Sequence, residues 1–393
     1  MSRAPARPRP CPHPCCQGPL AAVILAAGKS TRLPRFKPLL SLGGQSLVAR
    51  AASLFRQAGI TDIVVVTGAR AGDVGAEVSA LGLRAVCNAD FEDGMFSSVR
   101  AGLAALPQGL AGVLVLPVDI PLIRPSTLRL LAERFRLSAA EALLPGFCGE
   151  PGHPPLLAAQ AIPKVLAWSG EGGLAGALAT LECELLPVAD AQILFDVDHE
   201  ASFAEAEARL PRLARASPRE ALALLEIHKA GARGLAHGRS VAEVALALAR
   251  ALNAGGEGGA GLDLELLEAA ALLHDIAKGQ PQHEEAGARL LADLGLTRTA
   301  EIVAAHRDID PATVAQPTER ELVYLADKLV RGPQRVSIAR RFQEKLDRFA
   351  GDAEAVAAIR RRLEHAQGMQ ALLERRLGQD LEELLRPVVL PGC

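Results

Sequence analysis

The chain has 393 residues, which suits two or three domains of about 150 residues each rather than one hydrophobic core. Hydrophobic residues make up 49% of it and charged residues 22%, with 43 basic against 45 acidic side chains, so the composition is that of a soluble globular protein with no general affinity for polyanions. No apolar run reaches the roughly 18 residues of a membrane span. The seven scattered cysteines fit a reduced compartment, so we expect a cytoplasmic protein.

Residues 1–19 are rich in proline and arginine, contain no acidic residue and lack the apolar core of a signal peptide. We expect a disordered tail there. A metal bound by Cys11, His13, Cys15 and Cys16 is the weaker alternative, because their spacing matches no zinc-binding pattern.

Residues 20–207 alternate short apolar runs with segments of helical periodicity such as SLVARAASLFRQAG. Strands that are apolar throughout, separated by helices, are typical of a parallel sheet covered on both faces. We therefore expect an α/β, Rossmann-like domain with a mostly parallel sheet. The expected strands are AAVILAA, DIVVVTG, RAVCN, GVLVLPV and ILFDVD.

The strand pattern stops near residue 205, and the segments that follow have the apolar spacing of amphipathic helices. The stretch 208–219, which contains arginine and proline, is the expected boundary. An all-α domain is predicted over 217–390, with NAGGEGGAG at 253–261 as a flexible loop. Basic runs such as ARRFQEKLDRF are interleaved with acids and have no aromatic platform, so we expect solvated helix faces and no nucleic-acid partner.

The letters Gly28-Lys29-Ser30-Thr31 look like the end of a phosphate-binding P-loop. A P-loop needs a glycine five positions before the Gly-Lys pair, and Val23 stands there. What remains is a strand that runs into a short loop, in which backbone amides, Arg32 and Lys37 can face a triphosphate. The alternative is a plain turn with basic surface residues.

The stretch Leu25 to Lys37 resembles the nucleotidyltransferase signature L-A-[AG]-G-x-S-x-R-[ML]-G-x-x-K, with Pro34 where glycine is usual. This resemblance implies a family that couples NTPs to phosphorylated acceptors. It gives Arg32 and Lys37 catalytic roles. It also assigns nucleotide binding to Ala26, Ala27, Gly28, Ser30 and Thr31.

Two further stretches, NADFEDGMFSSVRAGL at 88–103 and GEPGHPPLL at 149–157, are similar to the molybdenum cofactor cytidylyltransferase group. The resemblance implies CTP as a substrate, a molybdopterin-type cofactor as acceptor, nucleotide contacts from Asn88 and Ser97, and molybdoenzymes as receivers of the product. The pair Ala26-Ala27, where guanylyl-transferring relatives carry Ala-Gly, favours CTP over GTP.

Charge on the triphosphate and on the leaving pyrophosphate has to be neutralised, which calls for a metal ion. Asp119 follows the apolar run VLVLPV, while Asp196 and Asp198 lie two residues apart in the expected last strand. The resemblance implies that Asp119 and Asp198 hold Mg²⁺, with Asp119 also catalytic. The family's G-D-x-G-x-R stretch here reads GEGGLA at 170–175, without its arginine, which leaves a sugar or alkyl phosphate open as acceptor.

Histidines and aspartates of the helical half lie on the apolar faces of their helices. His237 shares a helical stripe with Val241 and Val244, and Asp327 lies between Val323 and Val330. A single buried histidine is ordinary. Burying aspartates without a cation is costly, so a metal site explains the set better.

The order H…HD…H…H…D resembles the metal-dependent HD phosphohydrolases over about residues 217–385, with LLHDIAKG and YLADKLVRG as the specific parts. The resemblance implies two divalent ions, with Fe or Mn expected, and a metal-activated water that attacks a phosphoester. It makes Lys278 the residue that neutralises the phosphate. The first metal would take His237, His274, Asp275 and Asp327, and the second His283 and His306.

Together these observations predict a fused enzyme of small-molecule substrates, in which a cytidylyltransferase-like domain precedes an HD phosphohydrolase. One hypothesis is that the hydrolase acts on a nucleotide related to the first domain's substrate or product. Two alternatives stay open: a sugar or alkyl phosphate as acceptor, and an HD domain that senses a nucleotide without cleaving it.

Overall fold

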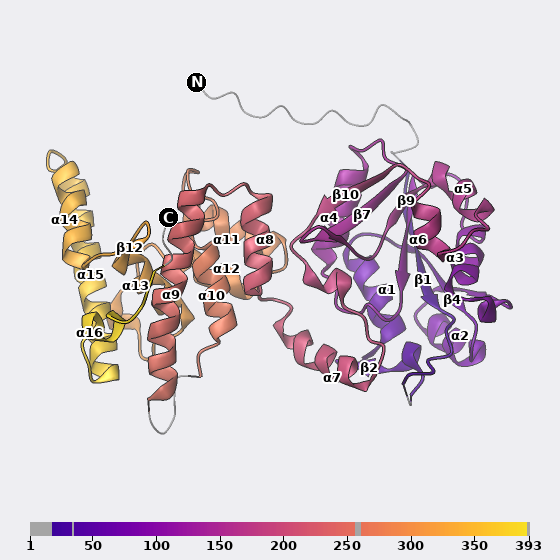
Figure 1. Cartoon of the computed structure of the whole chain (residues 1–393), viewed down its shortest axis with the longest axis horizontal. Coiled ribbons are helices and arrows are strands. Elements are labelled where there is room, and N and C mark those ends of the chain that lie inside the picture. Colours follow the sequence, from indigo (N-terminus) through magenta and orange to yellow (C-terminus); the bar gives the residue numbers. More distant parts are fainter. Residues whose placement is uncertain (1–17, 34, 256–260, 391–393) are drawn as a thin grey trace. The chain divides into compact units, whose positions relative to one another are not determined.

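The computed structural model describes residues 18–33, 35–255 and 261–390, and its contacts divide the chain after Leu213 into two units (Figure 1). The predicted disordered tail before Gly18, the metal site at its cysteines, Pro34 and the middle of the Gly-rich loop lie outside the described residues. Within the described ranges, no helix has both the length and the apolar character needed to cross a membrane.

The first unit is built on one mixed, mostly parallel sheet in the order β10-β7-β9-β6-β1-β4-β5, with β8 paired to β7. Strand β9 runs antiparallel between β6 and β7, while β1 pairs in parallel with both β4 and β6. The strands are β1 Leu20–Ala26, β4 Asp62–Thr67, β5 Arg84–Cys87, β6 Gly112–Pro117, β7 Ala142–Phe147, β8 Glu150–Pro151, β9 Leu156–Ala158 and β10 Cys183–Pro187, with a separate hairpin of β2 Ser41–Leu42 and β3 Gln45–Ser46.

Helices cover both faces of this sheet, which is why its central strands are apolar throughout. Val23 and Leu25 of β1 belong to the core beneath α3, α5 and α6, and the alternate residues Ala22 and Ile24 are equally buried on the face of α1, α2 and α4 (Figure 1). The helices are α1 Leu47–Gln57, α2 Ala71–Ala80, α3 Met95–Ala104, α4 Pro125–Phe135, α5 Ile162–Ala167, α6 Gly173–Leu178 and α7 Glu200–Arg209.

Helix α3 packs unusually close to the sheet at Gly102. A Cβ atom on Gly102 would lie 2.4 Å from Val23 and 2.9 Å from Val66, so only glycine fits without a shift. This close contact holds α3 against β1 and β4.

The chain reverses its direction across the sheet at β1, because β4 and β5 lie on one side of β1 and β6 lies on the other. Ligands of open α/β sheets bind beside such a switch point, outside the carboxyl ends of the strands. The loop after β1 and Asp119, two residues after β6, both lie at this edge.

The expected strand ILFDVD is not a strand, and the last parallel strand is Cys183–Pro187 instead. Residues Ala191–Leu194 form a 3-10 helix, which the Asp190 side chain caps by accepting from Gln192 N. The carbonyl oxygen of Ile193 accepts from His153 N in a loop instead of from a neighbouring strand. Val197 N donates to Asp119 O at 2.8 Å, which holds the end of this segment beside β6. Asp198 therefore reaches the sheet edge from a loop.

A buried ion pair anchors that loop. Asp190 and Arg124 are 2% and 6% exposed, and Arg124 Nη1 donates to Asp190 Oδ1 at 3.0 Å. Asp190 Oδ2 also accepts from Arg124 N at 2.9 Å and from Thr127 Oγ1 at 2.7 Å. These bonds tie the start of α4 to the segment that ends at Asp198.

The second unit is helical, as expected, with one short hairpin that the sequence did not indicate, β11 Val330–Arg331 with β12 Gln334–Arg335. Helices α9, α10, α12 and α13 pack around a shared apolar core (Figure 1). The helices are α8 Pro218–Ile227, α9 Ala232–Ala254, α10 Leu264–Leu273, α11 His283–Asp293, α12 Thr297–Ala305, α13 Glu319–Leu329, α14 Ile338–Arg348, α15 Ala353–Leu377 and α16 Leu381–Leu385.

We expect Asp190→Ala to lower the free energy of unfolding of the first unit by about 3 kcal/mol or more, because Arg124 loses its buried carboxylate. Urea denaturation of the full chain, followed by circular dichroism, measures the change. Asp73→Ala is the control, since Asp73 pairs with Arg70 at the surface, where both side chains are more than half exposed. Equal effects of the two substitutions would contradict the anchoring role.

Candidate functional site

The loop after β1 is shaped by Ser30, whose φ of 57° is in the left-handed region. Ser30 Oγ accepts from Lys37 N at 2.9 Å, so the loop closes on the residue that carries the lysine. Gly28 and Thr31 are exposed on this loop. Their exposure leaves backbone amides open to a ligand at the sheet edge.

Lys37 brings the two predicted magnesium ligands together. Its Nζ atom donates to Asp119 Oδ2 at 3.1 Å and to Asp198 Oδ1 at 2.8 Å. Arg32, largely exposed, donates from Nη1 to Asp198 Oδ2 at 2.9 Å. Four residues predicted from three separate parts of the sequence thus form one cluster.

The charges in this cluster stabilise one another. The hydrogen bond from Lys37 lowers the pKa of Asp198, with a smaller effect from Arg32. Partial burial would lower the pKa of Lys37, but Asp119 and Asp198 raise it above its usual value. The two carboxylates offer the oxygen donors that Mg²⁺ prefers, so the residues fit a magnesium site.

Asn88 orders the turn before α3. Its Nδ2 atom donates to Ser97 Oγ at 2.8 Å and to Ser98 Oγ at 3.0 Å, and Asp90 N donates to Asn88 Oδ1 at 3.0 Å. Gly94, at φ 97°, turns the chain into the helix. The predicted nucleotide-binding residues Asn88 and Ser97 therefore contact each other at one rim of the site.

A cavity of about 900 Å³ opens beside these residues and extends from Leu25 and the start of α3 to Gly172–Ala175. Its described lining contains neither lysine nor arginine and is mostly apolar. His153 lines it, with Nδ1 buried and without a hydrogen-bond partner, and burial lowers the pKa of this histidine despite the nearby Asp119 and Asp196. The sequence placed His153 in a motif but gave it no role.

Ala26 and Ala27 are almost fully buried at the end of β1. The Ala27 methyl lies against Gly68, where an added Cβ would come within 2.8 Å of it. Lys29, the residue that gives the loop its P-loop appearance, pairs instead with Glu92 at the surface. The methyl of Ala27 therefore narrows the space between the carboxyl ends of β1 and β4.

In the second unit, the predicted metal ligands come from helix ends that meet at one point. His237 lies in α9 and Asp327 in α13, while His274 and His306 are the C-terminal caps of α10 and α12. His283 is the first residue of α11. His237, His274, His306 and Asp327 are all at least nine-tenths buried.

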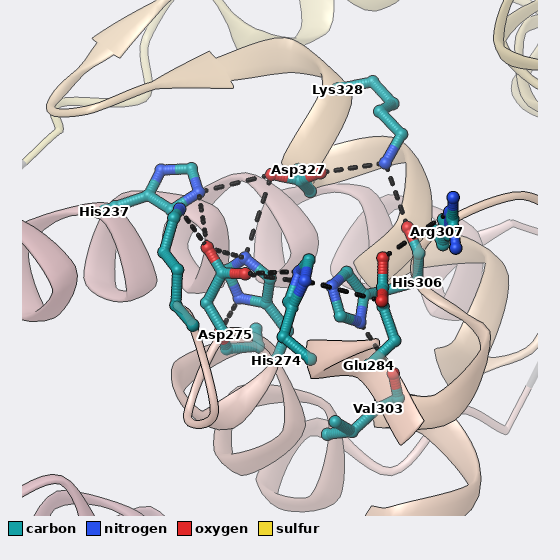
Figure 2. A network of polar contacts seen from close by, with 12 residues as sticks. His237, His274, Asp275, Glu284, Val303, His306, Arg307, Asp327 and Lys328 are labelled. Atoms are coloured by element: carbon teal, nitrogen blue, oxygen red, sulfur yellow. Dashed lines mark hydrogen bonds and ion pairs between the residues drawn. The ribbon is translucent and has the colours of Figure 1, made fainter. Parts of the chain in front are cut away.

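Asp275 lies between two groups of histidines (Figure 2). Its Oδ2 atom is 3.5 Å from His274 Nε2 and 3.9 Å from His237 Nε2. Its Oδ1 atom is 3.3 Å from His283 Nε2 and 3.9 Å from His306 Nε2. One carboxylate thus offers an oxygen to each of two neighbouring clusters, a geometry suited to two metal ions.

The histidines are oriented for metal binding by backbone carbonyls. His274 Nδ1 and His306 Nδ1 lie 2.7 and 2.6 Å from the carbonyl oxygens of Ala271 and Val303, which can only accept, so these nitrogens carry the proton. Nε2 of each ring is left as a lone pair, and that of His274 is buried without a partner. Burial lowers the pKa of His274 to about 4, so it is neutral at pH 7.

Two cations that the sequence did not assign, Lys328 and Arg341, lie beside Asp327. Lys328 Nζ donates to Asp327 Oδ2 at 2.9 Å, and His237 Nε2 lies 3.2 Å from Oδ1 (Figure 2). Arg341 Nη2 donates to Oδ1 at 3.0 Å. Burial alone would raise the pKa of Asp327, but Lys328, His237 and Arg341 hold it well below its usual value. The expectation that this basic helix presents only a solvated face is therefore wrong for Arg341, whose side chain is largely buried against Asp327.

A cavity of about 400 Å³ leads to these ligands. Lys278, predicted to neutralise phosphate, lines it and pairs with Asp275 through a largely exposed side chain. The buried Glu284 was not predicted, since nothing in its sequence position distinguishes it from an ordinary helix-start glutamate; its Oε2 atom lies 3.4 Å from His283 Nδ1.

Comparison with curated proteins matches the first unit to part of longer chains. The protein is 39% identical over 142 residues to the bifunctional protein GlmU of Xanthobacter autotrophicus, a match that covers 34% of this chain and 30% of the relative. The bifunctional protein GlmU of Geobacter metallireducens is 38% identical over 114 residues, with 28% and 24% covered. The match thus spans less than a third of the curated relatives' length.

Solved structures resemble the same unit. Rv0371c from Mycobacterium tuberculosis is 23% identical, with 49% of this chain and 98% of that chain covered and a TM-score of 0.43. Molybdopterin-guanine dinucleotide biosynthesis protein A from Archaeoglobus fulgidus is 16% identical, with 49% and 99% covered and a TM-score of 0.39. A structure of Rv0371c in complex with manganese is a further neighbour.

Comparison with protein families assigns both halves of the chain. Residues 22–185 match the MobA-like NTP transferase domain, and residues 234–332 match the HD domain, a type typical of phosphohydrolases. The prediction of these two domains in one chain is confirmed. The chain is therefore an enzyme in which a MobA-like NTP transferase domain precedes an HD domain.

Proposed function

We propose that the first unit transfers CMP from CTP to a molybdopterin-type cofactor and releases pyrophosphate, and that the product passes on to molybdoenzymes. The observation that carries this proposal is the contact of Lys37 with both Asp119 and Asp198 at the switch point of the sheet. A magnesium ion held by these two carboxylates would neutralise charge on the triphosphate and the leaving pyrophosphate.

The side chains around the cluster suit the remaining tasks of the reaction. The exposed loop after Gly28 would offer its backbone amides to the phosphates, and Arg32 and Lys37 would balance the negative charge that gathers on the α-phosphate during attack. The attacking acceptor phosphate needs no proton removed at neutral pH, so the chain's contribution is to align the two phosphates and to stabilise their charge.

The cavity beside the cluster favours a broad, partly apolar acceptor. Its described lining lacks lysine and arginine and includes Met95, Phe96 and Leu174, which suit the face of a fused ring better than the hydroxyls of a sugar. This lining supports a molybdopterin-type acceptor over the sugar and alkyl phosphates that the absent arginine would permit.

We propose that the second unit is a phosphohydrolase with two divalent ions, iron or manganese, bound by its histidines and aspartates. The arrangement of Asp275 between two histidine clusters supports two ions, which would supply charge neutralisation and a water of lowered pKa. Lys278 would meet the phosphate at the mouth of the cavity. The fusion suggests a nucleotide related to the first unit's substrate or product as the target.

We expect Asp198→Asn and Asp119→Asn to lower pyrophosphate release with CTP and anaerobic molybdopterin cofactor by about a hundredfold or more, because each removes a metal-binding charge. A coupled pyrophosphate assay measures the rate. Asp196→Asn is the matched control: it makes the same change two residues away, on an exposed side chain. Equal losses in Asp196→Asn and Asp198→Asn would contradict the assigned ligand.

The same assay tests the acceptor. Release that depends on the cofactor and prefers CTP over GTP, ATP and UTP supports the proposal. If no NTP supports release with the cofactor while sugar or alkyl phosphates do, the acceptor is wrong and the transferase class stands.

Ala27→Gly should lower the preference for CTP over GTP by about tenfold, because it removes the methyl that narrows the space between the strand ends, and one methyl group discriminates by roughly this factor. The ratio of the two kcat/KM values is the measurement. General damage to the loop lowers both values and leaves the ratio unchanged, so an unchanged ratio would argue against Ala27 as a specificity residue.

In the second unit, Asp275→Asn should reduce bound metal from about two ions per chain to fewer than one and abolish phosphoester hydrolysis, because both clusters lose their shared ligand. Metal analysis after dialysis and assays with CTP, CMP and the cytidylylated cofactor measure the two effects. Asp293→Asn, an exposed change at the end of α11, is the control. Two bound ions with no turnover on any phosphoester would favour a sensing module.

A further inference from the structure

We infer that the HD cavity contains a second phosphate subsite, formed by Arg341 and Lys345 of α14 and Arg362 of α15. The inference rests on the proposed hydrolase function and specifies its substrate class: a compound that carries a second phosphate next to the one that is cleaved, as a nucleoside 5′-diphosphate does. The metal ligands and Lys278 suffice for the scissile phosphate alone.

The described lining of the cavity holds more positive than negative side chains. Its carboxylates are Asp275, Glu284 and Asp327. Its cations are Lys278, Arg307, Lys328, Arg341, Lys345 and Arg362. Such an excess beside a pair of metal-binding clusters favours a polyanion over a neutral or singly charged ligand.

Four of these cations are accounted for by the three carboxylates. Lys328 pairs with Asp327, and Arg307 Nε lies 3.8 Å from Glu284 Oε1 (Figure 2). Arg341 also pairs with Asp327, and Lys278 pairs with Asp275. These contacts leave the cavity's other two cations to be explained.

Among residues 18–33, 35–255 and 261–390, no carboxylate oxygen lies within 4.0 Å of the charged group of Lys345 or Arg362, although Asp327 acts on Lys345 from farther away. Arg362 Nε is also buried there without any hydrogen-bond partner. A buried guanidinium donor left unpaired is costly, and a phosphate oxygen is the acceptor that its planar fork fits best.

The cations of the subsite also repel one another. The pKa of Lys345 is lowered because the side chain is partly withdrawn from water and because Arg341, Lys328 and Arg362 lie close to it, and this outweighs the opposing effect of Asp327. Holding like charges together in this way reduces stability unless a ligand offsets it. A bound dianion removes the repulsion, so the cluster is better explained as a binding feature than as a structural one.

The three residues lie beyond the part of the chain that matches the HD domain. That match ends at residue 332, whereas α14 begins at Ile338 and α15 at Ala353. Buried Ile338 and Phe342 hold α14 against the unit, so that Arg341 points to Asp327 from outside the matched domain. The metal ligands therefore lie within the matched segment, whereas Arg341, Lys345 and Arg362 follow it in the chain.

The test compares binding of pyrophosphate and orthophosphate to the manganese-loaded, desalted full-length protein by titration calorimetry. Pyrophosphate is also a product of the reaction proposed for the first unit, so that unit can bind it too. Pyrophosphate binding that remains in Asp275→Asn is therefore assigned to the first unit and subtracted. The variants are Lys345→Gln, whose side chain is exposed enough to preserve folding, and Arg362→Gln. Arg361→Gln is the matched control, because Arg361 is the exposed neighbour of Arg362 on α15 and does not line the cavity.

We expect the metal-dependent site to bind pyrophosphate about tenfold more tightly than orthophosphate. Lys345→Gln and Arg362→Gln should each remove about tenfold of pyrophosphate affinity and leave orthophosphate affinity and metal content unchanged, while Arg361→Gln changes neither.

Unchanged pyrophosphate affinity in both variants, with metal and orthophosphate still bound, would overturn the subsite and leave the hydrolase proposal intact. A wild-type protein that binds neither metal nor orthophosphate in the second unit would overturn both.

Discussion

A carboxylate that is withdrawn from water has to be matched by positive charge, and both units are organised by this requirement. In the first unit, Lys37 contacts both Asp119, 82 residues later in the chain, and Asp198, 161 residues later. In the second, Asp327 is surrounded by Lys328 and by Arg341 of a different helix. The balance of charge therefore also holds together the segments that form each site. Long cationic side chains are equally suited to phosphate oxygens, which is why such clusters serve phosphoryl and nucleotidyl chemistry.

Much of the fold was predictable because its signals are local. The central strands are apolar throughout and the helices are amphipathic, so each element is recognisable from its own residues. The segment ILFDVD has the composition of a strand, yet Asp190 turns its beginning into a 3-10 helix by accepting from Gln192 N. That competition depends on the buried partner Arg124, which lies 66 residues earlier. The antiparallel course of β9 is likewise a matter of tertiary pairing, and no local pattern marks it.

The site residues also fall into two groups, those that local motifs identify and those that only tertiary packing identifies. Residues that belong to compact motifs, such as Lys37 and Asp275, could be chosen from the sequence, and the fold brings them to their expected neighbours. Arg341 could not, because its helix contains several arginines in a run of mixed charge, and only the packing of Phe342 selects the one that reaches Asp327. His153 belongs to the stretch GEPGHPPLL, which gives it no role, and its buried position at the large cavity is visible only in the structure.

The geometry of the second unit bears on whether it acts or only senses. Binding a phosphorylated ligand requires cations alone, and the residues of α14 and α15 already provide these. The site also has a carboxylate with one oxygen toward each of two histidine clusters, and imidazoles whose Nδ1 protons are fixed by backbone carbonyls. Neither feature is needed to bind a phosphorylated ligand. They place neutral nitrogen donors and charged oxygens where two metal ions could share a substrate. Because this arrangement costs the burial of Asp327 and His274, its presence favours hydrolysis over sensing.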